Sequence, residues 1–303
     1  MTGIRHVLEI DDLTSAEQAA VLDLAERRDV PKLLDRQGVA LLFEKPSART
    51  RHSMEMAVVQ LGGHPAYINA EEVGLDERET VEDVTRTLAG YYALLGARVF
   101  DHRTVERMAA VSPVPVLNLL CDRSHPMQAL ADLLTIRQEF GTLAGRRLAF
   151  VGDANNVCRS LCLAAAAAGM ELRVATPPGY GLGELDLDRI RAAGGDPVCT
   201  TDPAEAVAGA EVVYTDVWVS MGQEAESAQR NDAFGAYQVD EALLAAAAPD
   251  AVFLHCLPAH RGQEVTAEVV DGSRSRVWQQ AANRMHSARG LLWFLLAAGA
   301  AER

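Results

Sequence analysis

Leu148-Ala-Phe-Val-Gly-Asp-Ala-Asn-Asn156 begins as an apolar run and ends in a polar turn. An alanine-rich helical pattern follows over 157–169, and a second apolar run, Glu171–Ala175, comes after it. These segments predict a strand, a helix and a second strand, which form a βαβ unit whose turn is a ligand-binding position in open α/β sheets. The turn contains a single glycine, Gly152, and lacks the Gly-x-Gly-x-x-Gly spacing. A nicotinamide dinucleotide is therefore disfavoured.

The same alternation of short apolar runs and helical patterns extends over the whole chain. Strands are expected at 39–43, 66–68, 97–100, 114–119, 147–151, 171–175, 212–215 and 252–255, and helices at 47–61, 80–95, 104–110, 127–140, 157–169, 187–193 and 277–301. This order predicts an α/β fold of two domains, each a mostly parallel sheet flanked by helices.

The turn residues of Phe140-Gly-Thr-Leu-Ala-Gly145 indicate a boundary within or just after the preceding helix. We expect a first domain over 1–135 and a second over 136–285. The C-terminal helix, residues 286–303, is expected to pack back across the domain boundary toward the first domain.

Composition limits the possible partners of the protein. The 303 residues are 49% hydrophobic and 23% charged, with a formal net charge of −14, which argues against a nucleic acid or an anionic membrane. We expect no secretory signal and no membrane-spanning segment, since the apolar runs are short. Five scattered cysteines without a Cys-x-x-Cys pair argue against disulfides and structural zinc, and predict a reducing cytoplasm.

Phe43-Glu-Lys-Pro-Ser-Ala-Arg-Thr-Arg51 predicts a strand, a short loop and a helix that begins at Ser47. Arg49 and Arg51 are unfavourable in a first helical turn, because cations oppose the positive end of the helix dipole. The conflict disappears if an anion is bound there, and Ser47, Arg49 and Thr50 would supply its donors. Two solvated surface arginines are the alternative interpretation.

His125-Pro-Met-Gln128 places a histidine and a glutamine three residues apart on one helical face. Both side chains could donate hydrogen bonds to a carbonyl oxygen that becomes anionic during attack. A purely structural histidine is the more common alternative.

Polar residues also follow the predicted strands of the second domain. Asn155 and Asn156 could bind a polar head group or only cap a helix. In Asp216-Val-Trp-Val-Ser-Met-Gly222 an aspartate could pair with an amine and Ser220 with a carboxylate. Cys256, in Phe253-Leu-His-Cys-Leu-Pro258, is either a small core residue or a contact for a substrate amine or a soft metal ion.

Taken together, these motifs resemble those of the carbamoyltransferases over nearly the whole chain. Ser47-Ala-Arg-Thr-Arg51 and His125-Pro-Met-Gln128 resemble the carbamoyl phosphate motifs of the aspartate and ornithine enzymes. Asp216-Val-Trp-Val-Ser-Met-Gly222 and His255-Cys-Leu-Pro258 resemble motifs of the ornithine carbamoyltransferases. The resemblance implies carbamoyl transfer from carbamoyl phosphate to the δ-amine of L-ornithine, giving citrulline and phosphate. It also implies a cleft between the two domains, a homotrimer or a multiple of trimers, and a place in arginine metabolism.

The resemblance also implies site residues. Carbamoyl phosphate would be bound by Ser47, Ala48, Arg49, Thr50, Arg98, His125, Gln128, Cys256, Leu257 and Arg284, and ornithine by Asn156, Asp216, Ser220 and Met221. Catalytic roles would belong to Arg49, Arg98, His125, Cys256 and Arg284, with no metal and no organic cofactor. The chain departs from the family at Ala48, where threonine is usual, so we expect altered phosphate binding and the same reaction. The loop 70–80, which in the family can reach a neighbouring subunit's site, gives no residue assignment.

Other functions stay open from the sequence. A carbamoyltransferase for putrescine or an N-acylated ornithine is the nearest, although the polar Ser220 loop favours a free α-amino acid. Aspartate is disfavoured, because the second domain has no arginine-rich signature for two carboxylates. A non-catalytic family member is a further alternative.

Overall fold

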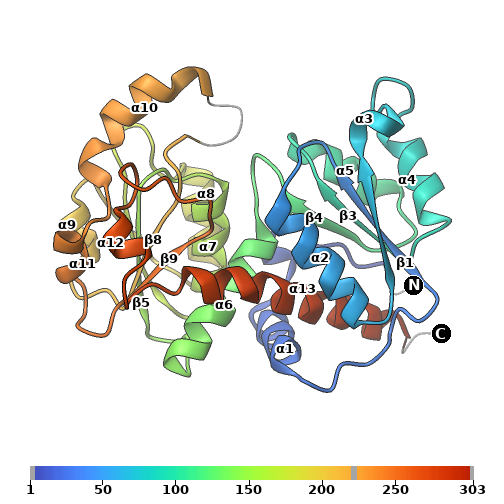
Figure 1. The fold of residues 1–303 in the computed structure, drawn as a ribbon, viewed down its shortest axis with the longest axis horizontal. Helices are drawn as coiled ribbons and strands as arrows, with labels where there is room; N and C mark the ends of the chain where they lie inside the picture. Colours follow the sequence, from blue (N-terminus) through green and yellow to red (C-terminus); the bar gives the residue numbers. More distant parts are fainter. Residues whose placement is uncertain (1–3, 220–223, 301–303) are drawn as a thin grey trace. The chain divides into compact units, whose positions relative to one another are not determined.

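The structure, a computed structural model, describes residues 4–219 and 224–300, with side chains for 4–219 and 225–297. It divides into two compact units, in each of which helices flank a parallel sheet (Figure 1). Unit 1 comprises Met1–Ala131 and Ala282–Arg303, and unit 2 comprises Asp132–Ala281. The predicted fold class is confirmed. None of the described helices is long and apolar enough to cross a membrane.

The sheet of unit 1 has the strand order β2-β1-β3-β4, with every neighbouring pair parallel. Its elements are η1 (Ile10–Asp12), α1 (Ser15–Glu26), β1 (Gly38–Phe43), α2 (Ala48–Gln60), β2 (His64–Asn69), α3 (Ala70–Val73), α4 (Val81–Ala89), β3 (Leu94–Arg98), α5 (His102–Val111) and β4 (Val116–Leu120). Two further helices, α6 (Pro126–Phe140) and α13 (Val277–Ala300), contain the points at which the chain passes from one unit to the other.

Unit 2 contains a parallel sheet of order β7-β6-β5-β8-β9. Its elements are β5 (Arg147–Val151), α7 (Asn156–Ala167), β6 (Glu171–Ala175), α8 (Glu184–Ala192), β7 (Val198–Thr200), α9 (Pro203–Val207), β8 (Val212–Thr215), η2 (Glu224–Glu226), α10 (Ser227–Phe234), η3 (Gly235–Tyr237), α11 (Glu241–Ala245), β9 (Val252–His255) and α12 (Ala267–Val270).

The central strands are apolar on both faces because helices cover both faces of each sheet. In β1, residues Val39 to Phe43 are all buried, so the side chains on both faces of the sheet are shielded from water. The sheet of unit 1 packs through Ala40 and Leu42 onto Val105 and Met108 of α5. Buried apolar residues also predominate in β5, β8 and β9, and these three strands and β6 have the bounds that the sequence predicts.

One predicted helix is wrong. Helix α4 ends at Ala89, with Gly90 as its C-cap, and does not continue to residue 95. Leu94 and Leu95 lie in β3 instead, where they are almost completely buried, so this strand begins before the predicted residue 97. The burial of these leucines in a parallel sheet outweighs a helical pattern that Gly90 already interrupts.

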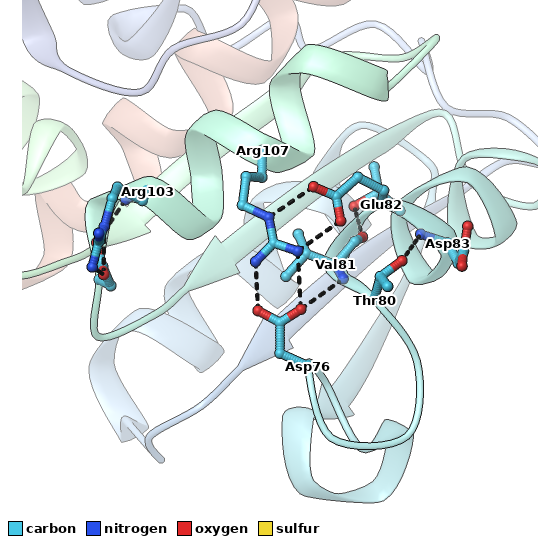
Figure 2. Close-up of polar contacts among 9 residues, drawn as sticks. Asp76, Thr80, Val81, Glu82, Asp83, Arg103 and Arg107 are labelled. Carbon is cyan, nitrogen blue, oxygen red and sulfur yellow. Dashed lines mark hydrogen bonds and ion pairs between the residues drawn. The ribbon is translucent and has the colours of Figure 1, made fainter.

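An arginine of α5 contacts the segment between β2 and α4. Figure 2 shows Arg107 between the carboxylates of Asp76 and Glu82. Its Nη2 donates to Asp76 at 3.0 Å and to Glu82 at 2.7 Å. The guanidinium lowers the pKa of Glu82 to about 2 and also lowers the pKa of Asp76. The loop 70–80, for which the sequence gives no assignment, is therefore tied to the body of unit 1 while Glu82 and Asp76 are ionised.

Helices α1 and α13 approach each other closely at Gly290. A Cβ atom at this position would lie 2.9 Å from the Ala25 amide nitrogen and would also collide with the Val21 carbonyl oxygen. Both obstacles are backbone atoms, so the contact cannot be relieved by a side-chain rotation.

We therefore expect Gly290→Ala to destabilise the protein by about 1–3 kcal/mol, as overpacking does, although alanine favours a helix. Chemical denaturation followed by circular dichroism would measure the loss. Gly235→Ala is the matched control, because nothing lies within 4 Å of the added Cβ and the backbone there is right-handed. A Gly290→Ala variant as stable as this control would contradict the proposed backbone contact.

Candidate active site

The predicted site residues gather at the carboxyl ends of the strands. In unit 1, β1 lies between β2 and β3, and in unit 2, β5 lies between β6 and β8. Loops diverge where the order of a parallel sheet reverses in this way, which leaves room for a ligand. Most unit 1 residues lie at the ends of β1, β3 and β4 or in the first turn of the helix that follows, while Arg284 comes from α13. The unit 2 residues lie in the same way after β5, β8 and β9.

The N-terminus of α2 is suited to an anion. Ser47 is its N-cap, as predicted, and the Ser47 Oγ accepts a 3.4 Å hydrogen bond from the Thr50 N–H. Ala48 is the first helical residue, a position whose N–H has no acceptor within the helix. The first turn of α2 contains no acidic residue. The helix dipole and the exposed N–H groups therefore favour a bound negative charge.

Two arginines from distant elements converge on the buried hydroxyl of Thr50. Arg98, the last residue of β3, donates from Nη1 at 3.3 Å, and Arg284 of α13 donates from Nη2 at 3.1 Å. Arg284 also donates to the Gln128 Oε1 at 2.5 Å. Thr50, Gln128 and Arg284 are all buried, so these bonds hold two guanidinium groups next to the start of α2.

Arg49 and Arg51 differ in their surroundings. Arg51 donates from Nε to Glu55 at 2.7 Å, and its guanidinium lies 4.0 Å from the centre of the Tyr67 ring. Arg49 is half-buried, and among the residues that the structure describes it forms no ion pair. Arg51 is therefore engaged within the fold, whereas Arg49 keeps its charge available for a ligand.

His125 directly precedes α6 and is buried. Burial, followed by the positive charges of Arg284, Arg98 and Arg49, holds its pKa well below the usual value for histidine. The ring is therefore neutral at pH 7, where it can donate one hydrogen bond without adding a charge. A neutral donor beside three arginines suits a carbonyl oxygen that gains negative charge.

In unit 2, Asp216 accepts hydrogen bonds from three directions. Its Oδ1 accepts from the Val217 N–H at 2.8 Å and from the Cys256 thiol at 2.9 Å. Its Oδ2 accepts from the Asn155 Nδ2 at 2.8 Å. Asp216 is buried and Cys256 is half-buried, so the carboxylate is fixed beside the thiol of a partly buried residue. This arrangement can orient an amine.

A second buried carboxylate, that of Asp153, lies close to Asp216 and forms an ion pair with Arg230. The Arg230 Nη1 donates to Asp153 at 2.8 Å and to the Trp218 carbonyl at 2.9 Å. Burial raises the pKa of Asp153, the Arg230 pair opposes that rise, and Asp216 adds to it. Arg230 thus compensates the charge of Asp153 next to the fixed Asp216.

His255 organises the loop after β9. Its Nδ1 accepts from the Leu257 N–H at 2.8 Å, so its Nε2 carries the proton toward Glu264, 3.1 Å away. His255 and Glu264 are completely buried. Leu257 adopts a left-handed φ of 61° before a cis peptide bond to Pro258.

Among the described residues, Asp216, His255 and Cys256 are close enough to share a metal ion, with ligand atoms within 4.8 Å of one another. Both ring nitrogens of His255 are already engaged by Leu257 and Glu264. The cluster therefore offers a thiol and a carboxylate rather than three ready ligands.

The structure gathers the predicted residues into two groups. Ser47, Ala48, Arg49, Thr50, Arg98, His125, Gln128 and Arg284 belong to unit 1, and Asn156, Asp216, Cys256 and Leu257 to unit 2. Ser220 and Met221 lie outside the described residues. Sequence reasoning missed the roles of Asp153, Arg230 and Glu264, and left Asn155 undecided between head-group binding and capping. Asn155 caps α7.

Known proteins match both units. Residues 5–138 match the family "Aspartate/ornithine carbamoyltransferase, carbamoyl-P binding domain". Residues 144–295 match "Aspartate/ornithine carbamoyltransferase, Asp/Orn binding domain". The two matches together cover nearly all of the chain.

Individual relatives agree with these matches. Ornithine carbamoyltransferases of Parafrankia sp. (strain EAN1pec) and Thermus thermophilus are 49% and 50% identical, over 96% and 98% of both chains. The solved structure of the Thermus thermophilus enzyme has a TM-score of 0.89 at 46% identity, covering 97% of this chain and 100% of that one. The Pyrococcus furiosus enzyme has a TM-score of 0.93 at 42% identity, covering 97% of each chain. The chain belongs to the aspartate/ornithine carbamoyltransferase family.

Proposed function

We propose that this protein transfers the carbamoyl group of carbamoyl phosphate to the δ-amine of L-ornithine, forming L-citrulline and phosphate. The observation that carries the proposal is the cluster at the start of α2, where Arg98 and Arg284 meet on Thr50 beside neutral His125. The Asp216–Cys256 pair of unit 2 supports an amine acceptor. Relatives named ornithine carbamoyltransferase, about half identical over almost the entire chain, support ornithine as that acceptor.

In the proposed reaction the phosphate group binds to the backbone N–H groups of Ser47 and Ala48 and to the side chain of Ser47 at the N-terminus of α2. Arg49 and Arg98 neutralise its charge, because guanidinium groups match phosphate oxygens in geometry. The absence of a hydroxyl at Ala48 leaves its backbone N–H as the donor at that position. His125 donates to the carbonyl oxygen of the carbamoyl group, with Gln128 and Arg284 beside it.

The neutral δ-amine of ornithine attacks the carbamoyl carbon, and a C–N bond forms as the oxyanion develops. The bond from this carbon to the phosphate oxygen then breaks, and phosphate leaves with the electron pair and accepts the amine proton. Arg49, Arg98, His125 and Arg284 stabilise the charge that develops. Cys256 and Leu257 are assigned to the reacting end of the substrates. Positioning supplies much of the rate, because carbamoyl phosphate is already a reactive donor.

We assign the ornithine end of the site to Asn156, Asp216, Ser220 and Met221. Support for Asp216 comes from its burial and its contact with Cys256, which together place a fixed negative charge next to a thiol. A free α-amino acid suits a loop with polar side chains, whereas putrescine has neither an α-amine nor a carboxylate. The family resemblance supports the other three assignments.

We further propose that the protein is a cytoplasmic homotrimer. All five cysteines are free thiols, which supports a reducing compartment. The family resemblance supports the trimer. Light scattering coupled to size-exclusion chromatography would test the assembly, and a monomer of 32.6 kDa would contradict it.

The experiment that tests the proposed reaction measures ureido-product formation by the purified protein with carbamoyl phosphate. Ornithine, putrescine, N-acetylornithine and aspartate are compared in parallel at equal concentration. We expect citrulline from ornithine and poor use of the other three amines. A preference for another amine would overturn the acceptor assignment, and no product from any amine would indicate a non-catalytic member of the family.

A further inference from the structure

Asn155 uses both ends of its amide group. Its Oδ1 accepts from the Val157 N–H at 2.9 Å and from the Cys158 N–H at 3.1 Å, and so caps α7. Its Nδ2 donates to the Asp216 Oδ2 at 2.8 Å. The contact with Asp216 joins the loop after β5 to the loop after β8 across 61 residues of sequence.

The cap fixes the direction in which the amide points. If the group were flipped, its NH2 would face the two N–H groups of α7, and the oxygen would face the carboxylate of Asp216. Both arrangements are repulsive, so a single orientation is compatible with the surroundings. The cap on α7 therefore points the NH2 group of Asn155 toward the Asp216 carboxylate.

The donor in turn fixes the Asp216 carboxylate. Its Oδ1 is held by Val217 and Cys256, and its Oδ2 by Asn155. Rotation about the Cβ–Cγ bond would break all three contacts. Asp153 does not compete for this donor through its carboxylate, because Arg230 binds it at 2.8 Å.

We propose that Asn155 is a positioning residue for the amine acceptor, which it serves by holding the Asp216 carboxylate in the orientation that meets the ligand amine. The inference rests on the proposed function, in which Asp216 orients ornithine. It adds a residue that does not itself contact the substrate. The cap on α7 and the orientation of Asp216 are thereby set by one side chain.

Substitutions can separate the capping of α7 from the contact with Asp216. Asn155→Ser keeps a good N-cap, but its hydroxyl is too short to reach Asp216 as well. Asn155→Asp also keeps the cap but presents an acceptor in place of the donor, so two carboxylates face each other. Asp202→Ser is the matched control, because Asp202 caps α9 in the same way, accepting from the Ala204 and Glu205 N–H groups.

For Asn155→Ser we expect kcat/KM for ornithine to fall by roughly 10–100-fold, the value of a hydrogen bond to a charged group. The KM for carbamoyl phosphate should stay within about twofold. The unfolding midpoint should fall by only a few degrees, because the cap remains and only the contact with Asp216 is lost. Asn155→Asp should lose at least as much kcat/KM. Asp202→Ser should leave both kinetic constants at their original values.

A second measurement does not depend on turnover. The Cys256 thiol donates to Asp216, so its alkylation rate depends on how that carboxylate is held. Releasing Asp216 in Asn155→Ser should therefore change the rate of Cys256 alkylation by iodoacetamide several-fold, as measured by mass spectrometry of the labelled peptide. If the original protein forms no citrulline, the proposed function fails and this rate still tests the positioning role. If Asn155→Ser has the same kinetic constants for ornithine and the same alkylation rate of Cys256 as the unsubstituted protein, the inference is overturned and Asn155 is a helix cap alone.

Discussion

Replacement of Arg49 by alanine is expected to lower kcat for citrulline formation by roughly 10²–10³-fold, the loss that follows removal of one preorganised donor. The physical reason is that Arg49 has no carboxylate partner among the described residues and lies at the start of α2. Its charge also contributes to the low pKa of His125, together with those of Arg284 and Arg98. The variant should therefore also show a higher pKa for His125.

The matched control is Arg51→Ala, two residues further along the same helix. Arg51 is bound to Glu55 and stacked on Tyr67, so its loss should affect stability more than turnover. We expect the activity of this variant to remain within about tenfold of the original. Steady-state kinetics and circular dichroism of both variants check the expectation. Equal activity of the Arg49 and Arg51 variants would remove the distinction on which the role of Arg49 rests.

Arg49→Lys distinguishes charge from geometry at the same position. Lysine keeps the positive charge but cannot form two parallel hydrogen bonds to a phosphate. An activity between those of the original protein and of Arg49→Ala would indicate that both properties contribute.

Strands of this fold can be predicted where they are buried on both faces. Leu148–Val151 and Val252–Leu254 are uninterrupted apolar runs, and the strands that contain them, Arg147–Val151 and Val252–His255, have the predicted bounds. β7, Val198–Thr200, was not predicted, because it has three residues at a sheet edge and two of them are exposed. Such a strand gains little from burial, and its residues carry no apolar pattern. The helix predicted over 80–95 failed for the opposite reason, since tertiary burial of Leu94 and Leu95 decided the structure.

The candidate site was predictable only where its chemistry is local in sequence. Ser47 and Arg49 share one turn of α2, so a dipole argument identifies an anion site without knowledge of the fold. The contact of Arg230 with Asp153 spans 77 residues and depends on how the segment after β8 folds back on the end of β5. The order of strands in a sheet is not encoded in a local pattern. The structure was therefore needed to find Asp153, Arg230 and the second contact of Asn155.

The second large effect is expected for Asp216→Asn, which should lower kcat/KM for ornithine by roughly 10²–10³-fold. The variant loses the negative charge that orients the amine. It also places an NH2 group among the Val217, Cys256 and Asn155 donors, all of which need an acceptor. The KM for carbamoyl phosphate should change by less than about threefold, because the residues proposed to bind its phosphate belong to unit 1.

The double variant Asn155→Asp, Asp216→Asn separates the effect of the hydrogen bond between residues 155 and 216 from the effect of the negative charge at residue 216. It restores an amide opposite a carboxylate, so thermal stability should recover toward that of the original protein. Activity should stay low, because the negative charge has moved from the loop after β8 to the loop after β5. Measuring KM for both substrates and the unfolding midpoint in the three variants completes the comparison. Recovery of ornithine kinetics in the double variant would mean that the hydrogen bond alone matters, while equal losses for both substrates in Asp216→Asn would show that Asp216 is not specific to the amine acceptor.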